Sequence, residues 1–212
     1  MQISNNNVNF TSCYKISTFE NKNDSNKVLD AECDLYPVAT NTSVLFKNEN
    51  GKYGFDLYAT CPDGFDSKLE KILNNKGINF KKRSLDDIRS VNGIISRVEL
   101  SDIQKNDGRK LVFVNTEKFD QAFKNDGIDY YIDRNEKNGF RNMEEHIDTG
   151  LPITASQVFL REENGKLAAT FYDGRHRYCI MRNLGADSVP ISLDEDSIKI
   201  AQKYGIIDKI TE

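Results

Sequence analysis

The stretch YDGRHR at residues 172–177 is the most informative part of the chain, because it joins a strand-like run to a helix-like run. A β-type run, 167–172, leads into Asp173 and Gly174, and residues 175–184 have helical character. Arg175, His176 and Arg177 therefore fall in the first turn of the predicted helix.

Positive side chains in a first helical turn oppose the helix dipole, at a cost of a few tenths to about 1 kcal/mol. The arrangement becomes favourable when an anion accepts the free N–H groups and the guanidinium forks of Arg175 and Arg177. Gly174 leaves room for a ligand beside the backbone. Asp173 either caps the helix or holds a metal ion or hydroxyl. The alternative is that these arginines simply pair with surface carboxylates.

The sequence around this turn resembles the ParB/sulfiredoxin superfamily over about the last third of the chain. The resemblance is carried by the order of LPI (151–153), a hairpin, DGRHR (173–177), LG (184–185) and VPI (189–191). In the superfamily a strand leads into a G-x-x-R turn, a helix follows, and a hydrophobic-Pro-hydrophobic strand closes the unit. The resemblance implies an α+β fold with a small mixed sheet and helices, preceded here by an N-terminal extension.

The resemblance also implies a nucleotide-phosphate site at the turn, for ATP or CTP with Mg²⁺. Gly174 matches the turn glycine, and Arg177 matches the arginine that contacts phosphates in the family. His176 matches a histidine of the sulfiredoxin-like and free-serine-kinase-like branches, so His176 and Asp173 are the expected catalytic residues. Asp173 is also the expected metal ligand. Arg175 stands where sulfiredoxins carry their reactive cysteine, which excludes sulfinic-acid repair at this turn, and the glutamate of the chromosome-partitioning branch is absent.

Composition indicates a globular protein. The hydrophobic fraction is 38%, and the net charge is 29 − 33 = −4. The pI of about 5.4 argues against strong duplex nucleic-acid binding, although the basic cluster 81–83 is either a local patch or a solvated strand end. No apolar run is long enough to span a membrane and the start is polar. We expect a cytoplasmic protein, the alternative being a bacterial effector exported to a host cytosol.

The four cysteines, Cys13, Cys33, Cys61 and Cys179, form no C-x-x-C pair, and with two histidines a structural zinc site is not expected. Cys179 is predicted to be a buried structural thiol rather than a nucleophile.

Further elements can be assigned along the chain. Residues 1–26 have few apolar anchors and are expected to be loosely ordered. Hairpins are predicted around Asn50-Gly51 and Asn164-Gly165, helices over 69–76, 119–126 and 141–147, and strands over 94–100, 111–114 and 189–193. A domain boundary is expected near residue 90, giving an extension or small α/β region (1–90) and a ParB/sulfiredoxin-like domain (91–212).

One acidic pair outside the turn is a second candidate. Glu144 and Asp148 are spaced i, i+4, so they share a helix face and could supply a base or metal ligand if that face meets Gly174. The alternative is a solvated helix face.

Two functional classes fit these features. The first is an ATP- or CTP-dependent phosphotransferase or nucleotide hydrolase acting on an unidentified small-molecule or protein acceptor. The second is a ParB-like module without turnover that binds nucleic acid or protein. Measured nucleotide turnover separates them.

Overall fold

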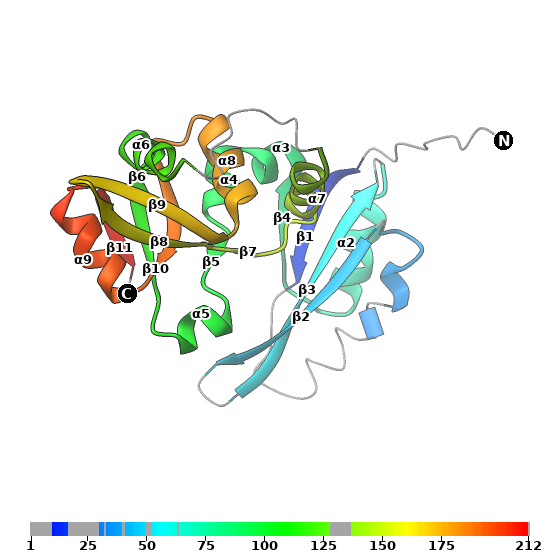
Figure 1. Cartoon of the computed structure of the whole chain (residues 1–212). Helices are drawn as coiled ribbons and strands as arrows, with labels where there is room; N and C mark the ends of the chain where they lie inside the picture. Colours follow the sequence, from blue (N-terminus) through cyan, green and yellow to red (C-terminus); the bar gives the residue numbers. More distant parts are fainter. Residues whose placement is uncertain are drawn as a thin grey trace. The chain divides into compact units, whose positions relative to one another are not determined.

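The computed structural model describes residues 10–16, 30–31, 33–39, 41–49, 52–62, 64–127 and 137–211. The chain forms two compact units (Figure 1): unit 1 comprises 1–89 and 146–151, and unit 2 comprises 90–145 and 152–212. The sequence predicted one boundary near residue 90. The structure also assigns the short segment 146–151 to unit 1, which the sequence did not suggest.

Unit 1 contains an antiparallel four-stranded sheet in the order β2-β3-β1-β4. Its elements are β1 (Phe10–Ile16), β2 (Asn41–Glu49), β3 (Lys52–Pro62), α2 (Asp66–Asn75), β4 (Phe80–Ser84) and α3 (Leu85–Arg89). The β2–β3 hairpin confirms the first predicted hairpin, while its Asn50-Gly51 tip lies outside the described residues. The helix predicted over 69–76 is confirmed as α2.

The expectation of a loosely ordered N-terminus is wrong for residues 10–16. They form β1, which pairs with β3 on one side and β4 on the other. The buried ring of Tyr14 packs in the unit 1 core with Leu57, Leu69 and Leu73. Pairing with strands far along the chain supplies the order that the local composition lacks. The remainder of 1–26 lies outside the described residues.

A group of charged residues surrounds the Tyr14 hydroxyl. This hydroxyl donates to Asp66 and, at 2.9 Å, to Glu70. Lys82 Nζ lies 3.0 Å from an oxygen of each carboxylate and 5.6 Å from the centre of the Tyr14 ring. Lys82, the central residue of the basic cluster 81–83, is therefore already neutralised by unit 1 itself.

The segment 146–151 is attached to unit 1 by two local contacts. Arg89 makes a two-pronged ion pair with Asp148, with both N···O distances 2.7 Å. The Cys13 thiol donates to the main-chain oxygen of Thr149 at 3.1 Å. A Cβ on Gly150 would lie 2.3 Å from Cys13 Sγ, so the segment packs as tightly as a glycine allows.

Unit 2 is built on a mixed five-stranded sheet in the order β11-β6-β10-β8-β9, in which β8 and β10 are parallel and the other pairs antiparallel. A parallel pair, β5 with β7, adds a second small sheet. Helices α6, α8 and α9 contact β9, β10 and β8 respectively (Figure 1). The combination of helices with small sheets confirms the predicted α+β fold class.

The elements of this part of the chain are α4 (Val91–Ile95), β5 (Val98–Glu99), α5 (Asp102–Asn106), β6 (Lys110–Asn115), α6 (Thr116–Asp126), α7 (Lys137–Asp148), β7 (Ile153–Thr154), β8 (Ser156–Glu163), β9 (Lys166–Asp173), α8 (Arg175–Asn183), β10 (Ser188–Leu193), α9 (Glu195–Lys203) and β11 (Ile207–Thr211). The last residues of α7 belong to unit 1.

Local sequence signals explain several of these elements. The β8–β9 hairpin turns at Asn164 (φ 51°) and Gly165 (φ 74°), the left-handed pair that a two-residue hairpin requires. Helix α6 ends at Gly127, whose φ is 71°. The hairpin, α6, α7, β6 and β10 all confirm predictions made from the sequence.

The predicted strand over 94–100 is wrong in its first half. Ser90 caps a short helix there: its hydroxyl accepts from the Gly93 amide at 3.0 Å, and its main-chain oxygen accepts from Ile94 N at 2.9 Å. Helix α4 therefore contains Ile94 and Ile95, and the strand starts only at Val98. A side-chain cap outweighs the β preference of two isoleucines.

Candidate functional site

Strand β9 runs directly into helix α8 at the DGRHR turn (Figure 1). Gly174 is the N-cap residue, with φ 85° and ψ 15°, and no side chain caps the helix. Arg175, His176 and Arg177 occupy the first helical turn, as the sequence predicted. A glycine N-cap leaves the positive end of the helix without a carboxylate or hydroxyl on the cap residue itself.

The backbone at Gly174 is closely packed against the start of β8. The hydroxyl of Ser156, a buried residue, donates to the Gly174 main-chain oxygen at 2.8 Å. A Cβ at position 174 would lie 2.7 Å from Ser156 Cα and 2.6 Å from Arg177 Nη2. Both the left-handed conformation and the lack of space therefore require glycine at this position.

Arg177 turns back over Gly174 and pairs with Asp173, four residues earlier. The Arg177 side chain is 15% exposed, whereas that of Asp173 is 66% exposed. Asp173 thus supplies part of the negative charge that the sequence assigned to an external anion. The Asp173–Arg177 pair is the arrangement predicted by the alternative in which an arginine binds a carboxylate of the chain.

His176 is held by packing within unit 2. Its ring meets that of Phe140 in α7 edge to face, with 5.0 Å between ring centres, and its Nε2 is buried. Arg175 is half-buried beside it. The sequence did not single out Phe140, which lies one residue before the predicted helix 141–147. Its only sequence signal is its aromatic character.

Asp173 is the metal ligand expected from the resemblance. Within the described ranges, no three His, Cys, Asp or Glu side chains gather closely enough to bind a metal ion. A single carboxylate suits Mg²⁺ brought in by a nucleotide, because Mg²⁺ keeps several waters and takes one or two carboxylates together with phosphate oxygens. These residues therefore fit a nucleotide-carried Mg²⁺ and not a metal site formed by the protein alone.

The rest of α8 is anchored in the core. Tyr178 is fully buried against Phe119 and Phe171, with ring centres 4.9 and 5.3 Å away. Burial, followed by the nearby Asp120 charge, raises the pKa of Tyr178 above its usual range. Asp120 also pairs with Arg182 of α8 at 2.8 Å. The helix that carries the turn is therefore rigidly placed.

Cys179 is fully buried in this helix. Burial raises the pKa of its thiol to about 11, and the nearby Arg182 charge offsets only part of that effect. The sequence prediction of a buried thiol is confirmed. A thiol that stays protonated at neutral pH is a poor nucleophile.

In the acidic pair of α7, Asp148 has a partner of its own. Asp148 is occupied by Arg89 in unit 1, and Glu144 is an exposed residue of unit 2. The two carboxylates share a helix face, yet Asp148 already has a bidentate partner. Its role in the described structure is to hold the segment 146–151.

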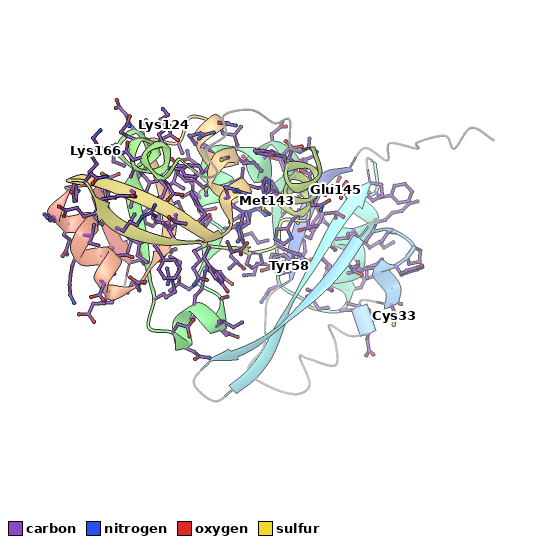
Figure 2. All side chains as sticks on the ribbon, viewed as in Figure 1. Cys33, Tyr58, Lys124, Met143, Glu145 and Lys166 are labelled. Atoms are coloured by element: carbon purple, nitrogen blue, oxygen red, sulfur yellow. The ribbon has the colours of Figure 1, made fainter. Side chains whose placement is uncertain are left out.

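A hollow of about 820 Å³ lies elsewhere on unit 2, and no sequence motif indicated it. Its walls come from α6, the β8–β9 turn and the residues after α9, including Lys124 and Lys166 (Figure 2). None of residues 173–177 lines it. Three segments distant in sequence make this surface, so no local motif could reveal it.

Comparisons with known proteins add little. No protein-family model matches the chain, and a search of curated proteins found no match. Among solved structures, the chain is similar to the oncogenic suppression activity protein, a plasmid fertility inhibition factor studied as a gold(I) cyanide derivative. The identity is 12%, 90% of this chain and 89% of that chain are covered, and the TM-score is 0.42. A similarity of this size carries no argument about function.

Over the described residues, no helix combines the length and the apolar character that crossing a bilayer requires.

Proposed function

We propose that the turn 173–177 binds the phosphates of a nucleotide, ATP or CTP, in a ParB/sulfiredoxin-like unit. The order expected from the resemblance is present: β9, the Gly174-to-Arg177 turn, α8, and then β10 with its central Pro190. The observation that carries the proposal is the glycine-capped start of α8 with a guanidinium folded across it. A helix N-terminus and an arginine fork are both donors suited to phosphate oxygens.

The reaction class we propose is phosphoryl transfer or nucleotide hydrolysis, in which positioning and charge stabilisation do most of the work. Arg177, with Arg175 beside it, would hold the phosphates. Asp173 would orient a nucleotide-bound Mg²⁺ or the attacking group. His176 would move a proton, since it lies one residue from the phosphate contacts and Phe140 fixes its ring.

Cys13, Cys33, Cys61 and Cys179 are all thiols rather than halves of disulfides. Reduced thiols fit the reducing cytoplasm that we propose as the compartment. Delivery to a host cytosol would satisfy the same condition.

Calorimetric titration of ATP and CTP, with and without Mg²⁺, tests the proposal. Arg177→Ala should bind at least tenfold more weakly, because a charge-assisted contact contributes about 1.5–3 kcal/mol. The matched control is Lys199→Ala, which removes one positive charge from an exposed helical ion pair in the same unit. Equal affinity in the wild-type protein and Arg177→Ala would refute the phosphate assignment.

Turnover separates the enzyme from the alternative, a module that binds nucleic acid or protein without catalysis. Phosphate release by the wild-type protein, lost in His176→Asn with nucleotide affinity kept, would support an enzyme. Nucleotide binding with neither phosphate release nor transfer of the phosphoryl group would favour the module. Within the described part of the chain, Asp173 belongs to no cluster of three potential metal ligands, and this observation keeps the second function in view.

A further inference from the structure

Asp173 and Arg177 form a closed arrangement across Gly174. Arg177 is the partner that the structure gives the Asp173 carboxylate, and the guanidinium reaches it by crossing directly over Gly174. The side-chain Nε and Nη2 atoms occupy the space where a Cβ of residue 174 would stand. The arginine of the candidate site therefore lies close against Gly174 while it is paired with Asp173.

The two side chains differ in their exposure to solvent. Asp173 is 66% exposed and Arg177 only 15% exposed, so an approaching anion encounters a carboxylate before it encounters the guanidinium. Carboxylate and phosphate are equivalent partners for an arginine fork. A phosphate that approaches Arg177 Nη2 therefore competes with Asp173 for that donor, and two negative groups cannot share the guanidinium without electrostatic cost.

We infer that Asp173 acts as an internal competitor that occupies Arg177 until a phosphate accompanied by a divalent cation displaces it. The inference rests on the proposed nucleotide function and assigns its regulation. A cation carried by the phosphates neutralises Asp173 in the act of displacing it, whereas a metal-free nucleotide must overcome its repulsion. Asp173 thereby makes the site select the metal complex over the free anion.

The decisive variant is Asp173→Asn, which removes the charge and keeps the shape of an exposed side chain. An exposed ion pair contributes about 0.2–1 kcal/mol, so without Mg²⁺ this variant should bind ATP or CTP about 1.4- to fivefold more tightly than the wild-type protein. With Mg²⁺ the wild-type affinity should rise, and that of Asp173→Asn should rise much less. Circular dichroism of the variant shows whether the fold is kept.

The matched control is Glu195→Gln. Glu195 is an exposed carboxylate in the first turn of α9, paired with Lys199 four residues later. This variant loses the same charge at another helix start in unit 2, and its metal-free affinity should stay at the wild-type value. An equal gain in Glu195→Gln would attribute the effect to net charge and overturn the role of Asp173.

A second measurement does not depend on nucleotide. Phenylglyoxal modifies accessible arginines, and peptide mapping can follow Arg177 alone. Arg177 should react faster in Asp173→Asn than in the wild-type protein. An unchanged rate would show that Asp173 does not restrain Arg177.

Different results would refute the competitor role of Asp173 and the proposed nucleotide-binding function. If the wild-type protein binds metal-free nucleotide as tightly as Asp173→Asn does, the competitor role is wrong and the phosphate site stands. If neither protein binds ATP or CTP under any condition, the proposed function fails, and with it this inference.

Discussion

The buried guanidinium of Arg109 donates twice to Ser192: Nε lies 2.9 Å from the hydroxyl, and Nη2 lies 2.8 Å from the main-chain oxygen. Nη2 also donates to the main-chain oxygen of Val158 at 2.6 Å. Arg109 thus joins the parallel strands β8 and β10. Its remaining contacts are Asp194 Oδ2, 3.4 Å from Nη1, and the Phe159 ring, centred 5.0 Å from the guanidinium carbon.

Arg109→Met should lower the free energy of unfolding by about 3 kcal/mol. The substitution keeps the apolar stem but leaves buried main-chain oxygens without their donor. Arg109→Lys should lower the free energy of unfolding less, because lysine keeps the charge although it lacks the planar fork. Urea unfolding measures both, and a loss below about 0.5 kcal/mol for Arg109→Met would place it among ordinary surface changes and contradict this role.

Gly174→Ala should destabilise unit 2 and abolish nucleotide binding. The control is Gly185→Ala, since Gly185 has φ 84°, close to the 85° of Gly174, but open space where its Cβ would be. Both variants incur about 1–2 kcal/mol of left-handed strain. Only Gly174→Ala adds the clash with Ser156 Cα, so its thermal midpoint should be clearly lower. Equal midpoints would mean that the close approach at Gly174 is unimportant.

Thiol labelling at pH 8 should modify Cys33 and leave Cys179 unreacted. Cys33 is exposed (Figure 2), whereas burial raises the pKa of the Cys179 thiol to about 11. Mass spectrometry of the labelled protein reads this directly. Cys179→Ala should retain all nucleotide binding and any turnover, and its loss of turnover with an intact fold would make Cys179 a functional thiol.

The same thiol predicts a dependence of stability on alkaline pH. The unfolded thiol has a pKa near 8.5, below the folded value of about 11. The unfolded chain therefore releases the proton first, and the stability that this thiol contributes is complete below about pH 8.5 and lost as the pH rises towards 11. Cys179→Ala should lose stability less steeply than the wild-type protein over that range.

The stability of unit 1 at acid pH should depend on Lys82. Hydrogen bonds from Lys82 and then from Tyr14 lower the pKa of Glu70 below its usual value. The stability that this carboxylate contributes is present above the unfolded pKa, about 4.3, and is lost as the pH falls below it. Lys82→Met should cost about 1 kcal/mol or less at pH 7, because the pair is partly exposed, and should flatten the acid dependence of unit 1.

Lys81→Met is the control for that experiment. Lys81 is the exposed neighbour of Lys82 on β4. Its substitution should leave the acid unfolding curve unchanged. A curve shifted equally by both variants would point to net charge and not to the Tyr14 group.

Sequence alone determined the local elements with strong signals. Asn164-Gly165 requires left-handed φ values and so defines the β8–β9 hairpin, and Gly127 and Gly185 follow the ends of their helices for the same reason. The placement of Arg175, His176 and Arg177 in one helical turn also followed from the sequence. These features depend on conformational preferences within a few residues.

Only the tertiary structure decided the features that depend on distant pairing. Strand β1 exists because β3 and β4 flank it, and the segment 146–151 joins unit 1 because Arg89 and Cys13 hold it. The state of the candidate site was likewise not readable from its motif. Whether Arg177 faces solvent or turns back to Asp173 depends on the space above Gly174, and Ser156, a residue of another strand, limits that space.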